Sequence, residues 1–161
     1  MPGRRPDKTQ FSNDGAAARA AAVALLARRD LPTGELQARL RGQGFDAETA
    51  AAVSAALSRE GVLNDERFAQ NYVVYRAGRG RGPLRIIVEL RRHGLADELI
   101  ETALATGPDW VALAHQVRRA KFGAQPPASW PQRARQSRFL QYRGFSADHI
   151  RLATGAEPDL D

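Results

Sequence analysis

Arginine is the residue type in this sequence best suited to binding chemistry. Of the 24 basic residues among 161, 22 are Arg, and the net charge is +6. A guanidinium binds phosphate or carboxylate groups through paired, parallel hydrogen bonds. Coding bias explains the preference for Arg equally well, since Ala is also very common. The positions of the arginines are therefore more informative than their number.

The arginines gather in two parts of the chain. Glu89 is the only acid between Arg76 and Arg92, and no acid occurs between Trp110 and Ala147. Such a surface suits an anionic partner, although a solvated charged face is the alternative. The candidate residues for binding a partner or nucleic acid are Arg76, Arg79, Arg81, Arg85, Arg91, Arg92, Arg135, Arg138 and Arg143.

Arg85 and Arg92 are the strongest pair among these candidates. They are seven residues apart, so they lie on one face of a helix with Glu89 between them. Residue 35, at the equivalent position of the first repeat described below, is Glu. We therefore expect the second and third repeats, rather than the first, to contact the partner.

No arrangement of residues supports catalysis or cofactor binding. His93, His115 and His149 lack metal-ligand spacing, and the chain has no cysteine. The glycine-rich segment at 78–82 lacks the Gly-Lys-Ser/Thr of a nucleotide-phosphate loop. Trp110, Trp130 and Phe139 could stack on bases, but core packing is the stronger prediction for all three. We expect no metal, no cofactor and no enzymatic activity.

Three short segments share the pattern Leu-x-x-x-Gly followed by an apolar residue. They begin at Leu40, Leu90 and Leu140, so the offset is 50 residues each time. Helices often end at a C′ glycine with positive φ, and the next residue then packs back on residue C3. The pattern predicts that the helix caps are Gly44, Gly94 and Gly144. A fixed period also indicates a repeat architecture.

The sequence predicts an all-α fold of three tandem three-helix repeats. First helices are expected at about 16–29, 65–76 and 109–122, with Phe68, Tyr72 and Tyr75 on one face of the second. The expected domains are a disordered arm at 1–15, repeats at 16–60, 62–106 and 108–155, and a tail at 156–161. Because small units bury little apolar surface alone, neighbours should share contacts and form an elongated, curved molecule.

The motifs resemble those of the RecX family of recombinase regulators. The similar segments are 62–69 (VLNDERFA), the glycine-rich stretch ending in Gly82-Pro83, and 139–145 (FLQYRGF). The resemblance covers about residues 17–153. Arg81 is a departure, since the family often has an aromatic residue there. This difference adds charge to the loop and weakens any stacking role for it.

The resemblance implies a non-enzymatic inhibitor of the RecA recombinase. RecX-like proteins bind the RecA–DNA filament and hinder strand exchange, ATP hydrolysis and filament growth. The implied partners are RecA and single- or double-stranded DNA, contacted directly or through the filament. We expect a cytoplasmic monomer with no membrane contact, since no apolar run is long enough to span a bilayer. A stand-alone helical nucleic-acid-binding protein is the alternative function.

Overall fold

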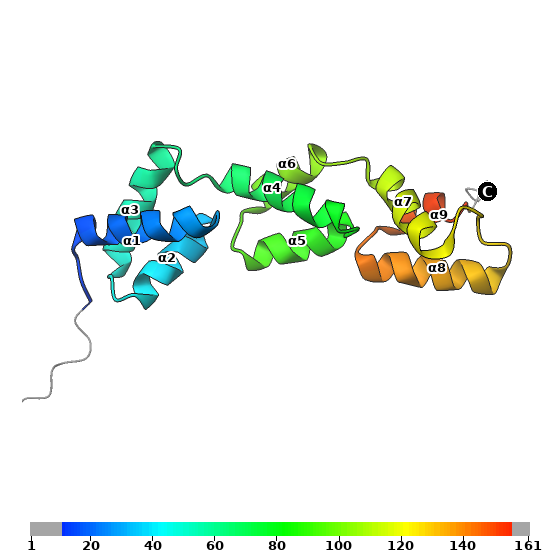
Figure 1. Ribbon diagram of the computed structural model, residues 1–161, viewed down its shortest axis with the longest axis horizontal. Helices are drawn as coiled ribbons and strands as arrows, with labels where there is room; N and C mark the ends of the chain where they lie inside the picture. The colour runs from blue at the N-terminus through cyan, green and yellow to red at the C-terminus, as the bar shows by residue number, and fades with distance from the viewer. Residues whose placement is uncertain (1–10, 156–161) are drawn as a thin grey trace, which may run out of the picture. The chain divides into compact units, whose positions relative to one another are not determined.

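The computed structural model describes residues 11–155, and these residues form nine α-helices and no strand. The helices are α1 (Gly15–Arg28), α2 (Thr33–Gly42), α3 (Ala47–Arg59), α4 (Asp65–Gly78), α5 (Pro83–Arg92), α6 (Asp97–Ala105), α7 (Trp110–Phe122), α8 (Trp130–Arg143) and α9 (Ala147–Ala153). They form three successive groups of three, α1–α3, α4–α6 and α7–α9, which are repeats 1, 2 and 3 (Figure 1). The prediction of an all-α fold with three three-helix repeats is confirmed.

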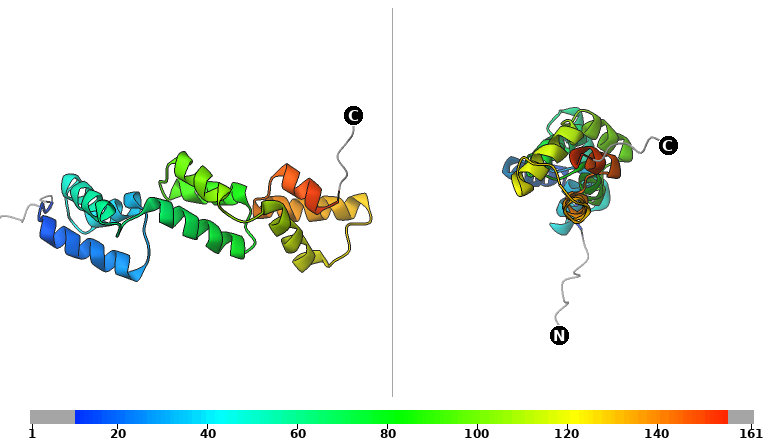
Figure 2. Two further views of the ribbon diagram at one scale, coloured as in Figure 1. Left: turned by 90° about the horizontal axis from the view of Figure 1, so that it is seen from above. Right: turned by 90° about the vertical axis from the view of Figure 1, so that its right-hand side faces the viewer.

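The chain divides into two compact units, one up to Phe68 and one from Ala69 onward. The first unit contains repeat 1 and the first turn of α4. The second unit contains the rest of repeat 2 and all of repeat 3. Figure 2 shows α7, α8 and α9 grouped together at the C-terminal end of this second unit.

The middle helix of every repeat ends at a glycine. φ is +100° at Gly44, +80° at Gly94 and +99° at Gly144. The N–H of the next residue donates to a leucine carbonyl five positions back, over 3.2 Å at Phe45, 3.3 Å at Leu95 and 3.2 Å at Phe145. These bonds complete Schellman caps. The accepting residues, Leu40, Leu90 and Leu140, are fully buried.

The first unit has its own apolar core. Leu36, Leu40 and Leu57 are fully buried among α1, α2 and α3. Asp14 and Asp46 cap α1 and α3, because their carboxylates accept from backbone N–H groups of the first turn. Pro32 offers no side-chain cap to α2, so the Asp65 carboxylate accepts instead from the Thr33 N–H at 2.7 Å.

The predicted disordered arm at 1–15 falls only partly within the described residues. Its first ten residues lie outside the described part of the chain, as does the expected tail at 156–161. Ser12, however, is paired with the loop after α2. Its N–H donates to the Gly44 carbonyl at 2.7 Å, and its carbonyl accepts from the Asp46 N–H at 2.9 Å. The arm prediction is wrong at this residue, because the loop beyond the Gly44 cap offers a free backbone edge.

The predicted buried face of α4, with Phe68, Tyr72 and Tyr75 together, is wrong for Tyr75. The helix buries Phe68, Ala69, Val73 and Ala77, whereas Tyr75 is 57% exposed. The alanines are small and apolar, so this side can pack closely, whereas Tyr75 carries a polar hydroxyl that solvent can satisfy. The Tyr75 ring instead lies 5.1 Å from the Arg79 guanidinium.

Repeat 3 contains a buried arginine that organises its long loop. Arg118 is 3% exposed, and its Nη1 donates to the Gln125 carbonyl at 3.1 Å. Gln136, on α8, is also buried, with its Oε1 3.5 Å from the same nitrogen. Arg118 is therefore a structural residue, although it belongs to the acid-free part of the sequence.

Candidate partner-binding surface

Helix α5 presents one buried and one exposed side. Ile86 and Leu90 are fully buried, while Leu84 and Val88 are about half exposed. Pro83 occupies the first turn, where a missing N–H costs nothing. The arginines of α5 lie around the exposed apolar pair, and this mixture of basic and apolar groups suits a macromolecular partner.

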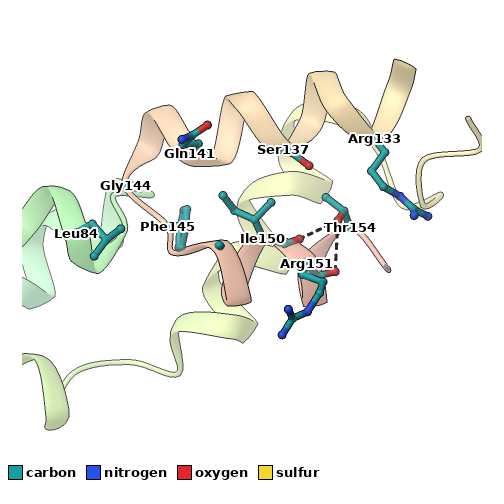
Figure 3. A pocket seen from close by; sticks show the side chains of 10 residues that line it. Leu84, Arg133, Ser137, Gln141, Gly144, Phe145, Ile150, Arg151 and Thr154 are labelled. Carbon is teal, nitrogen blue, oxygen red and sulfur yellow. Dashed lines mark hydrogen bonds between the residues drawn. The ribbon is translucent and has the colours of Figure 1, made fainter. Parts of the chain in front are cut away.

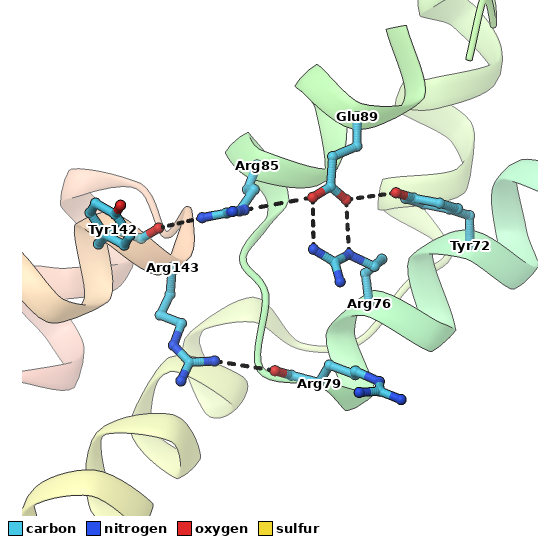
Figure 4. A network of polar contacts seen from close by, with 7 residues as sticks. All are labelled: Tyr72, Arg76, Arg79, Arg85, Glu89, Tyr142 and Arg143. Carbon is cyan, nitrogen blue, oxygen red and sulfur yellow. Dashed lines mark hydrogen bonds and ion pairs between the residues drawn. The ribbon is translucent and has the colours of Figure 1, made fainter. Parts of the chain in front are cut away.

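Glu89 binds three polar side chains of repeat 2. Its carboxylate accepts from Arg76 at 2.7 and 2.9 Å and from the Tyr72 hydroxyl at 2.8 Å, and it lies 3.6 Å from the Arg85 Nε (Figure 4). Arg76 and Glu89 are only 20% and 18% exposed. Arg76 therefore joins α4 to α5, and it is a positioning residue rather than an open contact.

The network changes two pKa values in ways that stabilise it. Burial raises the pKa of Glu89, but hydrogen bonds from Arg76 and Tyr72 outweigh this effect and hold it below its ordinary value. Burial, with the hydrogen bond to Glu89, raises the pKa of Tyr72 to about 12. Both groups therefore keep their hydrogen-bonding forms at neutral pH.

The start of α5 contacts the end of α8, and we call this contact the α5–α8 joint. The Gly82 N–H donates to the Arg143 carbonyl at 2.8 Å, and the Leu84 N–H donates to the Gly144 carbonyl at 2.9 Å. Unpaired N–H groups at one helix start thus meet unpaired carbonyls at another helix end, with their dipoles aligned favourably.

Side chains add two further bonds across the joint. Arg85 Nη1 donates to the Tyr142 carbonyl at 3.1 Å, and Arg143 Nη1 donates to the Arg79 carbonyl at 3.3 Å (Figure 4). Both arginines were predicted as partner contacts. The structure places them where repeats 2 and 3 meet.

Arg81 is half-buried, with its Nε enclosed by the protein. The other predicted arginines are more accessible. Arg79 and Arg135 are exposed and lie over the rings of Tyr75 and Phe122. Arg91 is paired with Asp97 at 2.9 Å, but both side chains are more than half exposed. Arg92 and Arg138 are exposed and have no ion pair or side-chain hydrogen bond within the described residues. Of the predicted arginines, these two are therefore the most available to bind a partner.

The predicted set of site residues lacks three exposed apolar or aromatic side chains of this region. Leu84, Val88 and Tyr142 are 51%, 46% and 81% exposed. With Arg92 they border a shallow pocket of about 370 Å³ at the α5–α8 joint. The sequence contains a signal for Tyr142, since it follows Arg138 by four residues and so shares its helix face. No local signal marks the exposure of Leu84 or Val88.

A second pocket lies on the repeat 3 side of the joint. It encloses about 440 Å³ between α5, α8 and α9, and its wall includes Leu84, Phe145, Ile150 and Arg151 (Figure 3). The Thr154 hydroxyl donates to the Ile150 carbonyl at 2.8 Å, which fixes this wall. Most of the surface that lines this pocket is apolar.

His93 and His149 make separate contacts within the fold. His93 packs edge-on against Tyr72, and His149 Nδ1 accepts from the Ser146 N–H in a capping box. Within residues 11–155, no group of histidines and carboxylates is arranged to hold a metal ion.

Trp110 is partly buried, but Trp130 is 79% exposed, so core packing is the wrong prediction for Trp130. Its place in the first turn of α8 leaves it without neighbours to cover it.

Comparison with known families agrees with this architecture. Models of the first, second and third three-helix domains of RecX match residues 18–55, 64–104 and 109–154. None of the described helices is long and apolar enough to cross a bilayer. These observations define a protein of tandem three-helix domains. The chain belongs to the RecX family.

Individual relatives show the same relationship. The chain is 44% identical over 155 residues to a Regulatory protein RecX of Halorhodospira halophila, covering 94% of this chain and 96% of that one. It is 41% identical over 145 residues to a Regulatory protein RecX of Pseudomonas fluorescens, covering 89% and 94%. The crystal structure of RecX from Lactobacillus salivarius has the same fold, with a TM-score of 0.79, 21% identity, and coverage of 89% and 96%.

Proposed function

We propose that this protein binds the RecA recombinase–DNA filament and inhibits strand exchange, ATP hydrolysis and filament growth. By doing so it would modulate recombinational DNA repair and the SOS response. The observation that carries the proposal is membership of the RecX family through all three repeats. The protein acts by binding, as a cytoplasmic monomer without a cofactor.

The contact surface that we propose consists of the exposed cations of repeats 2 and 3. Arg92 and Arg138 are its main residues, because neither is used in an ion pair within residues 11–155. Tyr142, Leu84 and Val88, which border one pocket with Arg92, add exposed apolar area. Aromatic and arginine side chains beside apolar contacts are typical of residues that dominate binding energy.

Replacing both Arg92 and Arg138 by Ala should weaken inhibition of RecA about fivefold to tenfold, as expected for losing roughly 1 kcal/mol of binding free energy. The measurement is the concentration of protein that halves ATP hydrolysis by RecA on single-stranded DNA. Helix content and the urea midpoint should not change, because neither side chain has an internal partner.

The matched control is the double variant Arg41→Ala and Arg59→Ala. Both residues are exposed arginines of repeat 1, so the change in net charge is the same. Equal losses of inhibition in the two double variants would contradict a surface confined to repeats 2 and 3. They would indicate a general effect of net charge.

A stand-alone nucleic-acid-binding protein is the second candidate, and the 81% exposure of Tyr142 favours it as a platform for base stacking. The salt dependence of DNA binding separates the two functions. The proposed function requires tighter binding to RecA filaments than to naked DNA at the same salt concentration. Equal affinity for both would favour the alternative.

A further inference from the structure

Three arginines belong to the backbone segments through which repeats 2 and 3 contact each other. Arg81 precedes Gly82, and an ideal Cβ on Gly82 would lie 2.4 Å from the Gly144 carbonyl carbon. Arg143 precedes Gly144, whose own ideal Cβ would lie 2.4 Å from the Cβ of Arg85. We call Arg81, Arg85 and Arg143 the joint arginines. They are distinct from the exposed Arg92 and Arg138 of the proposed partner surface.

The joint arginines have too little negative charge near them. Glu89 is the acid of this network, and its two oxygens already accept from Arg76 and Tyr72 at 2.7 to 2.9 Å. The Arg85 Nε is farther from it, at 3.6 Å. Burial lowers the pKa of Arg81, and the positive charges of Arg143, Arg85 and Arg76 lower it further. The folded joint therefore contains unbalanced repulsion between cations.

Hydrogen-bond donors are also left over. The Arg81 Nε is buried and has no hydrogen-bond partner among the described residues. Arg143 donates through Nη1 to the Arg79 carbonyl, and Arg85 donates through Nη1 to the Tyr142 carbonyl. A guanidinium has several further N–H donors. Because buried donors in folded proteins are nearly always paired, a missing acceptor is the simplest explanation.

We propose that the joint arginines bind a phosphate group, and that its binding holds repeats 2 and 3 together. Phosphate matches the site because it brings negative charge and several acceptor oxygens to guanidinium groups. The phosphate comes either from a nucleic-acid backbone or from a free phosphate ion. The site needs no recombinase, so it can be tested on the protein alone.

The experiment measures hydrogen exchange at the Gly82 and Leu84 amides of the full chain. These are the two N–H groups that donate across the joint. Inorganic phosphate at about ten times its dissociation constant should slow their exchange about tenfold, with saturation, beyond the effect of chloride at equal ionic strength. The backbone amides of repeat 1 should not respond.

Arg81→Gln should abolish the response to phosphate, and Arg143→Gln is the second variant should the first not fold. Arg119→Gln, at an exposed arginine of α7, is the matched control and should keep the response. Without phosphate, Arg81→Gln should unfold at the same urea concentration as the unchanged protein or a higher one. A merely structural Arg81 would instead make that variant less stable.

A short single-stranded oligonucleotide, used in place of the ion, identifies the source of the phosphate. A response to both probes, lost in Arg81→Gln, supports a site open to free phosphate. A response to the oligonucleotide alone, also lost in that variant, supports a site for backbone phosphate. An unaltered response in Arg81→Gln and Arg143→Gln, or one that chloride matches, overturns the proposal.

Discussion

Gly144→Ala should lower the free energy of unfolding of the second unit by about 3 to 5 kcal/mol, far more than the same change at the other two caps. The new Cβ would lie 2.4 Å from the Cβ of Arg85 and 2.8 Å from its backbone nitrogen. Backbone atoms cannot move aside as the end of a flexible side chain can. The α5–α8 joint must therefore open or distort.

Gly94→Ala and Gly44→Ala are the matched controls. Each glycine has the same cap and a φ of +80° or +100°, yet an added Cβ meets nothing within 4 Å. Each should cost only the left-handed strain, about 1 to 2 kcal/mol. Urea unfolding of the three variants gives the difference, and faster exchange of the Gly82 and Leu84 amides would locate it at the joint.

Equal losses in the three variants would contradict this account. They would mean that the cap alone determines the cost at Gly144, and that the two backbone bonds of the α5–α8 joint add little stability. A loss at Gly144 without faster exchange at Gly82 and Leu84 would place the strain elsewhere in repeat 3.

The contrast among the three glycines shows what the sequence can predict. All three share one local pattern, so the sequence predicts the caps and, from their spacing, the repeats. The difference at Gly144 depends on a helix start some 60 residues earlier in the chain. Nothing in the Leu-x-x-x-Gly pattern encodes that contact, because the donating groups are backbone N–H groups common to every residue.

The same limit applies to the candidate site. The sequence identifies a basic region, but the partner of each arginine depends on tertiary packing. Arg76 is held by Glu89, Arg118 is buried beside Gln136, and Arg92 is exposed. Helical periodicity places Arg85 and Glu89 on one face correctly. It cannot show that the Tyr142 carbonyl of repeat 3 accepts from Arg85.

The partly buried Glu89 network should be the second most sensitive part of the protein. We expect Glu89→Gln to lower the free energy of unfolding by about 2 to 3 kcal/mol. Removing one partner of a fully buried ion pair costs about 3 to 5 kcal/mol, and residual exposure of 18% to 20% lowers this figure. The variant leaves Arg76 and Arg85 without their carboxylate. Arg91→Gln, which breaks an ion pair that is mostly exposed, should cost less than about 1 kcal/mol.

The pH dependence tests the cause of that loss. Because the folded protein holds the pKa of Glu89 below its ordinary 4.5, the carboxylate stabilises the fold above that pH. Its contribution is lost as the pH falls through the lower, folded pKa. The stability gap between the unchanged protein and Glu89→Gln should therefore be widest near neutrality and close in acid. Urea unfolding from pH 7 to pH 3 measures it.

A second substitution separates charge from packing. If unpaired cations cause the loss, then Arg76→Gln added to Glu89→Gln should restore part of the stability, since one uncompensated charge is removed. If the loss comes only from the hydrogen bonds to Tyr72 and Arg76, the second substitution should restore nothing.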